Sequence, residues 1–190
     1  MKKRILIAED ESIIRMDLKM MLQDHGYEVV GEAGDGDRAV ELAFELKPDL
    51  VLMDIKMPKI NGLQASTIIG QQLDLPVLLI TAYSQKEFVE KSKQDNIVGY
   101  LVKPISESSL MPAVSVALHQ AEKAKKLKKS IRTAQDEIQK RKLIEQAKGL
   151  LMEKEKLSEQ EAYKLLRNQS MSRQLTMELL AQEIISKYAD

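Results

Sequence analysis

The chain has 190 residues, 44% of them hydrophobic and 31% charged, so it can fill a proper core and is long enough for two domains. The absence of cysteine excludes disulfides and cysteine-ligated metals and fits a reducing cytosol. Its net charge is zero, so as a whole the chain is neither basic nor acidic.

Short apolar runs alternate with amphipathic stretches over residues 1–120. We predict strands at 4–9, 28–33, 50–54, 77–81 and 98–102, and helices near 12–25, 37–46, 63–73, 85–94 and from 106 onward. Three of the strands are almost continuous Ile, Leu and Val, which is typical of parallel strands covered on both faces. Five β–α repeats predict an α/β fold with a doubly wound parallel sheet in the order 2-1-3-4-5.

The first apolar run is too short for an export signal, because it covers only residues 5–8 and stops at Glu9. No apolar stretch approaches the roughly 20 residues that cross a bilayer. We therefore expect a cytoplasmic protein with no membrane partner.

Polar residues follow the ends of the predicted strands. Glu9 and Asp10 follow the first strand, Asp54 ends the third, Thr81 ends the fourth, and Lys103 follows the fifth. Ligands of open parallel sheets bind at the carboxyl ends of the strands, near the switch in strand order. We therefore expect the three carboxylates in one pocket. They would repel one another unless a cation bound between them, and oxygen ligands favour Mg²⁺.

Asp54 could then act as a nucleophile toward a phosphoryl donor and form an acyl phosphate. The metal and Lys103 would neutralise the transferred group, and the Thr81 hydroxyl would bind a phosphoryl oxygen. Each residue alone also has an ordinary explanation: Asp as a helix cap, Thr as a strand former, Lys as a surface charge. Five of them at strand ends together favour phosphoryl transfer.

The segments AEDE, VLMDIKMPKINGL, LLITAY and GYLVKPI resemble the receiver domain of two-component response regulators. The resemblance implies a flavodoxin-like five-stranded fold and a sensor histidine kinase as partner. It also implies a cis bond between Lys103 and Pro104. The roles that it implies are phosphoacceptor for Asp54, Mg²⁺ ligands for Glu9, Asp10, Asp54 and the Lys56 backbone carbonyl, catalysis for Thr81 and Lys103, and switching for Thr81 and Tyr100.

Beyond residue 113 there is one glycine and no proline, so helix becomes the default. We expect a receiver domain at 1–120, a coiled-coil linker helix at 121–141 and an all-α output domain of three helices at 142–190. In the linker, residues with alternating spacings of three and four form a short apolar seam: Ala124, Leu127, Ile131, Ala134 and Ile138. The seam favours a homodimer over packing within the monomer. It is too short to hold a dimer alone, so phosphorylation should promote dimerisation.

Ser158 and Glu161 predict a capping box for a helix through Arg167, and Ser172 is the predicted N-cap of a last helix ending near Tyr188. Gly149 suggests a close helix approach. Tyr163 is a core residue or a stacking platform, and we favour the core. The other expected core residues are Ala147, Leu150, Leu151, Leu165, Leu166, Leu179 and Ile184.

Residues 132–188 resemble the ANTAR module of RNA-binding antiterminators, through Ala147-Lys148-Gly149, Glu161-Ala162-Tyr163 and Leu166-Arg167. The whole chain is similar to the ethanolamine-utilisation antiterminator regulators. The resemblance implies binding to tandem RNA stem-loops in leader transcripts. Residues 121–190 carry 16 Lys and Arg against 11 Asp and Glu, a charge of +5 that suits a polyanion or a solvated helix surface.

The expected RNA contacts are exposed polar residues, most of them around the turn between the last two helices: Lys148, Lys164, Arg167, Asn168, Gln169, Ser170, Arg173 and Gln174. Two alternatives remain. A DNA-binding transcription factor would need a recognition helix rich in Arg, Asn and Gln on one face, and no helix shows one clearly. An adaptor would bind only protein. No second acid–base cluster follows residue 120, so we expect no enzymatic output.

Overall fold

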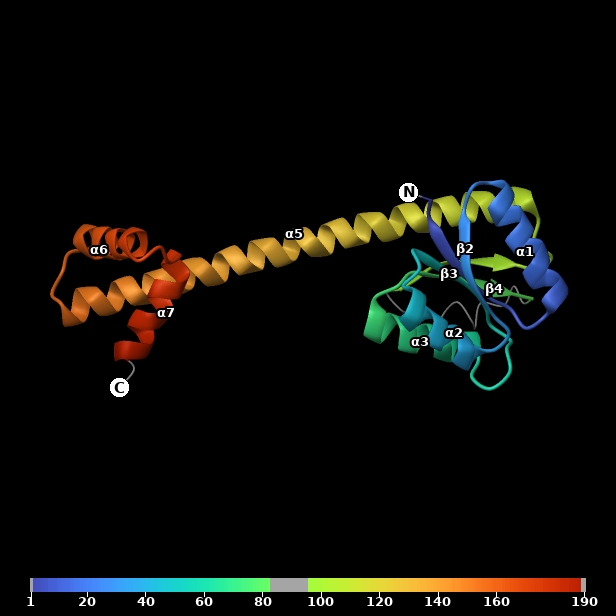
Figure 1. Cartoon of the computed structure of the whole chain (residues 1–190), viewed down its shortest axis with the longest axis horizontal. Helices are drawn as coiled ribbons and strands as arrows, with labels where there is room; N and C mark the ends of the chain where they lie inside the picture. The colour runs from blue at the N-terminus through green and yellow to red at the C-terminus, as the bar shows by residue number, and fades with distance from the viewer. Residues whose placement is uncertain (1, 83–95, 189–190) are drawn as a thin grey trace. The chain divides into compact units, whose positions relative to one another are not determined.

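The computed structural model describes residues 2–82 and 96–188, which form two compact units, 1–125 and 126–190. The first unit contains a parallel sheet of β1 (Arg4–Ala8), β2 (Glu28–Ala33), β3 (Leu50–Asp54), β4 (Val77–Thr81) and β5 (Ile97–Val102). The strand order is β2-β1-β3-β4-β5, as predicted (Figure 1). The flavodoxin-like fold class is thereby confirmed. The helix predicted at 85–94 lies outside the described residues.

Helices cover both faces of this sheet (Figure 1). Successive side chains of a strand point to opposite faces. Ile5 and Ile7 therefore pack against α1 (Ser12–Asp24) and the beginning of α5 (Glu107–Lys154). Leu6 and Ala8 pack against α2 (Gly36–Leu46) and α3 (Gly62–Leu73). Every residue of β3 and β4 is buried, which explains their continuous apolar sequences.

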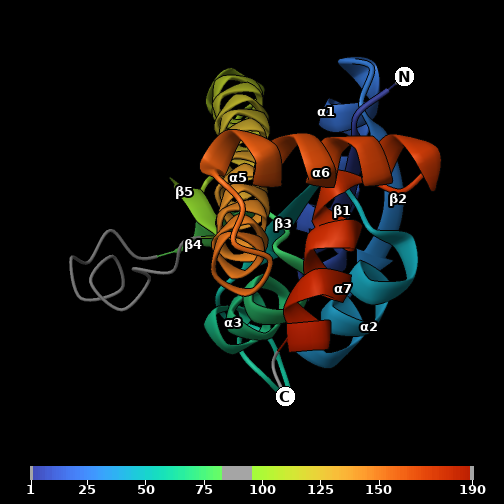
Figure 2. The same ribbon diagram turned by 90° about the vertical axis from the view of Figure 1, so that its left-hand side faces the viewer.

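The second unit is all-α, as predicted, and combines the end of α5 with α6 (Glu159–Ser172) and α7 (Met177–Tyr188) (Figure 2). Small residues at the contacts let these helices approach closely. The buried core consists of Ala147, Leu151, Ala162, Leu166, Leu180, Ala181 and Ile184. In the part of the chain that the structure describes, no helix is long and apolar enough to span a membrane.

The helix boundaries of this unit partly differ from the prediction. The capping box is present, because Ser158 accepts from the Glu161 amide and the Glu161 side chain accepts from the Ser158 amide. However, α6 continues past Arg167 to Ser172, so the predicted N-cap at Ser172 is wrong. Thr176 precedes α7 instead, and its Oγ1 accepts from the Leu179 amide at 3.4 Å. Burial of Leu166 and Ser170 against the rest of the unit keeps this polar stretch helical.

Several expected core positions are also corrected. Leu166 and Ile184 are buried, but Tyr163 is 46% exposed and Leu179 is 49% exposed. Both lie outside the core cluster of this unit, on helix faces that are only partly covered. A Cβ added at Gly149 would meet no heavy atom within 4 Å among the described residues, so this glycine does not mark a close helix approach.

Candidate functional site

A cleft of about 570 Å³ opens at the carboxyl ends of the strands. Its lining includes Asp10 and Glu11 after β1, Asp54 at the end of β3, Thr81 at the end of β4, and Lys103 after β5. The strand order brings these chain segments together, because β1 and β3 are neighbours and β4 and β5 follow them. The expected pocket is therefore present.

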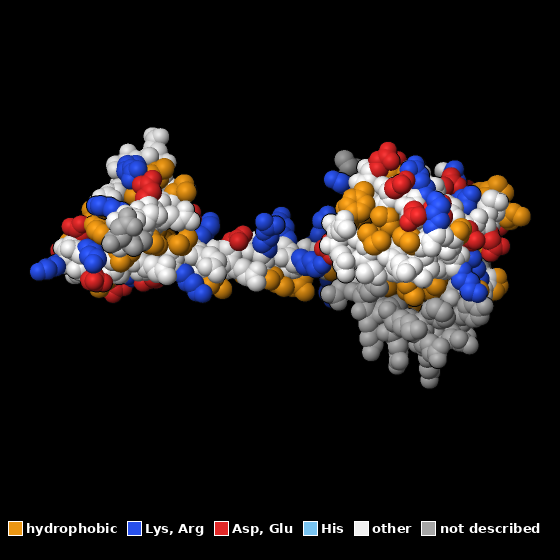
Figure 3. All heavy atoms as spheres, turned by 90° about the horizontal axis from the view of Figure 1, so that it is seen from below, with side chains coloured by type: hydrophobic (Ala, Val, Ile, Leu, Met, Phe, Trp, Pro, Cys, Tyr) orange, Lys and Arg blue, Asp and Glu red, His pale blue; other side chains and the backbone are white. Residues whose placement is uncertain are grey.

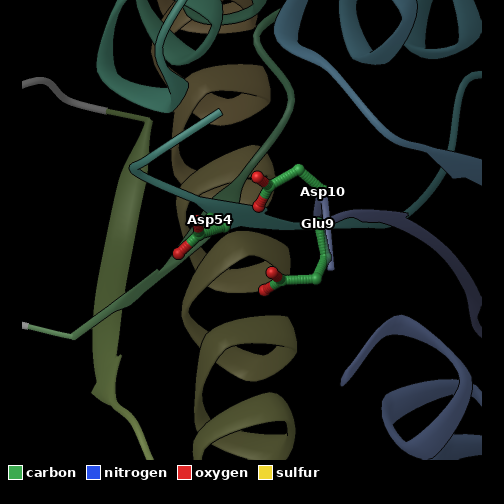
Figure 4. Close-up of side chains that lie close together, drawn as sticks. All are labelled: Glu9, Asp10 and Asp54. Atoms are coloured by element: carbon green, nitrogen blue, oxygen red, sulfur yellow. The ribbon is translucent and has the colours of Figure 1, made fainter. Parts of the chain in front are cut away.

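Three carboxylates meet beside this cleft, those of Glu9, Asp10 and Asp54 (Figure 4). One oxygen from each lies within 4.8 Å of the others. Asp10 is exposed, whereas Glu9 is fully buried and Asp54 is 3% exposed. The Glu9 amide donates to the carbonyl of Ala33 at 3.0 Å, which extends the β1–β2 pairing past the strand and holds Glu9 inside.

Lys103 supplies the positive charge opposite these carboxylates. Its Nζ lies 3.0 Å from Glu9 Oε1, 2.9 Å from Glu9 Oε2 and 3.4 Å from Asp54 Oδ1. The backbone amide of Lys103 donates to the carbonyl of Thr81 at 2.8 Å, so the end of β5 is tied to the end of β4. The bond from Lys103 to Pro104 is cis, as the resemblance implied.

Burial and mutual repulsion dominate the electrostatics of the site. Burial raises the pKa of Glu9, with a further contribution from the charge of Asp54, although Lys103 opposes the change. Burial likewise raises the pKa of Asp54 against the opposing effect of Lys103, and Asp10 adds to the increase. Burial disfavours the Lys103 ammonium, but Glu9 and Asp54 together outweigh it and raise the pKa of Lys103. The site therefore holds more negative charge than one lysine compensates.

The donor set fits a hard divalent cation. Carboxylate oxygens are the ligands that Mg²⁺ prefers. Glu9 Oε2 is buried and, among the described residues, accepts no hydrogen bond, although Nζ of Lys103 lies 2.9 Å away as an ion-pair partner. Each carboxylate oxygen has two lone pairs, so an ion pair with Lys103 leaves Oε2 with the capacity to bind a cation.

The other predicted receiver residues lie around the site. Thr81 is buried and lines the cleft. The Lys56 amide donates to Asp54 Oδ2 at 3.1 Å. Tyr100 is on β5 and 57% exposed. The roles predicted for the site residues stay predictions, including switching by Thr81 and Tyr100 and the ligand role of the Lys56 carbonyl.

Gly62, which begins α3, is a site residue that the sequence reasoning missed. A Cβ here would collide with the backbone oxygen of Asp54, far inside van der Waals contact. Glycine therefore lets α3 begin against the end of β3. The signal in the sequence is Asn61-Gly62, since Asn61 caps α3 through a capping box with Gln64.

The candidate RNA contacts in the second unit fall into two groups. Lys164, Arg167 and Asn168 are exposed on α6, Gln169 is half-buried there, and Arg173 and Gln174 are exposed in the turn after it. The expected exposure is wrong for Lys148 and Ser170. Lys148 lies between Glu145 at 2.6 Å and Glu159 at 2.8 Å, and the Ser170 hydroxyl donates to the Leu175 carbonyl at 2.6 Å.

Comparisons with known proteins agree with this architecture. Residues 5–115 match the response regulator receiver domain, and residues 132–185 match the ANTAR domain. The chain is 48% identical over 149 residues to the transcriptional regulatory protein PdtaR of Mycobacterium tuberculosis, covering 78% of this chain and 73% of that protein. It is 38% identical to the chemotaxis protein CheY of Thermotoga maritima over 116 residues, which are 60% of this chain and 97% of that protein.

A solved structure gives the same result for the first unit. The N-terminal domain of a response regulator/sensory box/GGDEF 3-domain protein from Carboxydothermus hydrogenoformans superimposes with a TM-score of 0.59 at 35% identity. The alignment covers 64% of this chain and 98% of that domain.

Proposed function

Because the chain belongs to the response regulators, with a receiver domain followed by an ANTAR domain, we propose that it is an RNA-binding antiterminator switched by phosphorylation of Asp54. The observation that carries the proposal is the convergence of three carboxylates and Lys103 at one edge of the sheet. A sensor histidine kinase is the proposed donor. We propose that the chain is divided into a receiver domain (1–120), a linker (121–141) and an output domain (142–190).

In the proposed reaction, a carboxylate oxygen of Asp54 attacks the phosphorus of a phosphohistidine. The phosphorus–nitrogen bond breaks, and the released imidazole nitrogen takes a proton from solvent. The Lys103 ammonium, 3.4 Å from Asp54, stabilises the charge on the transferred oxygens, and Thr81 donates its hydroxyl to one of them. Glu9, Asp10, Asp54 and the Lys56 carbonyl would hold Mg²⁺, which when bound offsets the negative charge of donor and acceptor.

An exposed apolar strip on α1 supports the docking of a partner beside this site. Ile13, Met16 and Met20 are 72%, 54% and 56% exposed. Their spacings of three and four place them on one helix face. Since α1 begins directly after the acidic residues, a kinase helix bound to this strip would have its phosphohistidine near Asp54.

The seam in α5 supports phosphorylation-dependent dimerisation. Leu127, Ile131 and Ile138 are each about half exposed or more. Figure 3 shows apolar side chains beside the lysines and arginines of α5. Because a short segment that begins with Lys103 joins β5, which carries Tyr100, to α5, a change at Thr81 and Tyr100 would reach α5 through packed elements.

The exposed face of α6 supports RNA binding. Lys164 and Arg167 are exposed, and Tyr163 is 46% exposed beside them. Cations can contact phosphates, and an aromatic ring can stack on an unpaired base. We propose that a dimer engages tandem stem-loops in leader transcripts and thereby prevents terminator formation. Ethanolamine-utilisation genes are the proposed target, from the similarity of the sequence.

Two measurements test the proposal. Intact-mass analysis after treatment with a small phosphodonor and Mg²⁺ should show one added phosphoryl group in the natural chain and none in Asp54→Ala. A gel-shift series should then show tighter binding of phosphorylated protein to two-hairpin RNA than to single-hairpin RNA or duplex DNA. Equal or tighter binding to duplex DNA would favour a DNA-binding transcription factor instead.

A further inference from the structure

Arg15 on α1 contacts the backbone of the acidic pair. Its Nη1 donates to the carbonyl oxygen of Glu9, and lies 3.4 Å from the carbonyl oxygen of Asp10. The side chain is 22% exposed, so it is largely packed rather than solvated. Arg15 has no part in the proposed phosphoryl transfer to Asp54.

The two carbonyls belong to the loop between β1 and α1, whose conformation determines where the carboxylates point. Glu11, at the N-cap of α1, makes no side-chain capping hydrogen bond. The Glu9 carboxylate accepts from the Glu11 amide at 3.3 Å, and Arg15 is the side chain that binds the carbonyl groups of this loop. A planar guanidinium presents several donors in a fixed geometry, so one side chain can orient two consecutive peptide groups.

Arg15 is itself held from the neighbouring strand. Its Nε lies 3.8 Å from Oε2 of Glu32 on β2, and Lys19 pairs with the other oxygen of the same carboxylate at 2.5 Å. A Cβ at Gly34 would lie 3.7 Å from Nη1, so the guanidinium also packs against the chain that follows β2. The orientation of Arg15 is thus determined by β2 and α1 together.

We propose that Arg15 is a positioning residue for the cation site: it holds the Glu9 and Asp10 peptide groups so that both carboxylates converge with Asp54. The inference rests on the proposed Mg²⁺ site. Partners that orient metal ligands typically contribute about 10–100-fold to metal affinity. Loss of the Arg15 contacts should therefore weaken Mg²⁺ binding about 10-fold.

Charge alone predicts the opposite result. A guanidinium close to a cation site repels a divalent ion, so its removal would tighten Mg²⁺ binding if electrostatics were its only effect. A purely structural contribution would lower the melting temperature of the metal-free protein and leave the Mg²⁺ dissociation constant unchanged. Mg²⁺ affinity therefore falls if Arg15 positions the site, rises if only its charge matters, and is unchanged if its role is purely structural.

The experiment measures Mg²⁺ binding to the full chain by isothermal titration calorimetry. Arg15→Ala should bind about 10-fold more weakly, and Arg15→Lys, whose ammonium can reach one carbonyl, should be intermediate. Lys19→Ala is the matched control. It removes one positive charge and one ion pair with Glu32, and the Lys19 side chain does not contact the carbonyl of Glu9 or of Asp10. It should stay within about twofold of the natural chain.

Equal or tighter Mg²⁺ binding by folded Arg15→Ala would overturn the inference. If circular dichroism shows that Arg15→Ala is unfolded, the Mg²⁺ affinities of Arg15→Lys and Glu32→Gln test the inference in its place. An unchanged Mg²⁺ affinity in both variants would overturn the inference. A natural chain that binds no Mg²⁺ would overturn both this inference and the proposed function, whereas failure of Arg15 alone leaves the proposed function standing.

Discussion

At the scale of single residues, the site depends on a glycine as much as on its carboxylates. Gly62 allows α3 to begin in contact with the Asp54 backbone, and any side chain there would collide with the Asp54 oxygen. Gly149 in α5 is a contrasting case, because its surroundings are open among the described residues. The same substitution at these two glycines should therefore have opposite effects.

We expect Gly62→Ala to lower the free energy of unfolding by about 1–3 kcal/mol, because the backbone must move, and to slow phosphorylation of Asp54. Gly149→Ala should instead stabilise its helix by about 0.5–1 kcal/mol, because alanine loses less backbone entropy. Urea denaturation followed by circular dichroism measures both. A destabilisation of similar size in both variants would contradict the argument.

A second pair of residues separates packing from contact with RNA. Leu166 is fully buried between the helices of the second unit, whereas Tyr163 is 46% exposed on the same helix. Leu166→Ala should cost about 2–5 kcal/mol of stability through cavity formation. Tyr163→Ala should change stability little and weaken binding to hairpin RNA in a gel shift. Undiminished RNA binding by Tyr163→Ala would show that the ring does not stack on a base.

At the scale of elements, the beginning of α6 is stabilised by a reciprocal cap. The hydroxyl and amide of Ser158 donate to Glu161 at 2.6 and 2.9 Å, and these bonds hold the pKa of Glu161 below its ordinary value of 4.5. Lys148 likewise lowers the pKa of Glu159, and Lys140 that of Glu178. Ionised glutamates thus connect all three helices of the second unit.

These shifts predict acid destabilisation of the second unit. A carboxyl whose pKa is lowered on folding contributes stability that is fully present above its unfolded pKa, near 4.5, and is lost as the pH falls through the lower folded value. The melting temperature of this unit should therefore fall as the pH is lowered from about 5 to about 3. Glu161→Gln should reduce this dependence, as thermal melts across that range would measure. An equally steep dependence in the variant would exclude Glu161 as a contributor.

At the scale of the whole molecule, one helix runs from the receiver domain into the ANTAR domain. α5 packs against the sheet through Leu110 and Val114 and contributes Ala147 and Leu151 to the second core. Between these segments the seam residues Leu127, Ile131 and Ile138 are exposed. An exposed seam on a helix shared by both units is a suitable place for phosphorylation to control assembly.

We expect light scattering to detect a dimer with phosphodonor and mainly monomer without it. Ile131→Lys should prevent the dimer by placing charge in the seam, whereas Thr133→Lys adds the same charge on the outer face of the helix and should leave the dimer intact. A dimer that joins two weak RNA sites gains avidity of around 10²–10⁴, so Ile131→Lys should also lose two-hairpin binding. Dimers of equal affinity in both phosphorylation states would contradict the switch.

The sequence by itself determined the sheet and its polar edge. Continuous apolar runs predicted β3 and β4. Glu9 and Asp10 follow β1 and Asp54 ends β3, and because parallel strands end at the same edge of a sheet, these three residues were predicted to meet. The capping box at Ser158 was equally local, since three residues of spacing are enough to form it. The strands and the capping box depend on residues that are close in sequence, and the polar edge depends on the parallel direction of the strands.

Only the tertiary structure decided which helix faces in the second unit are covered. Helical spacing groups Tyr163, Leu166 and Ser170, but it does not say which side meets another helix; packing buried Leu166 and Ser170 and left Tyr163 exposed. Lys148 is enclosed by glutamates from two helices, and Arg15 reaches carbonyls in the loop before its own helix. These contacts depend on how distant or folded-back segments meet in space, which the periodicity of one segment does not encode.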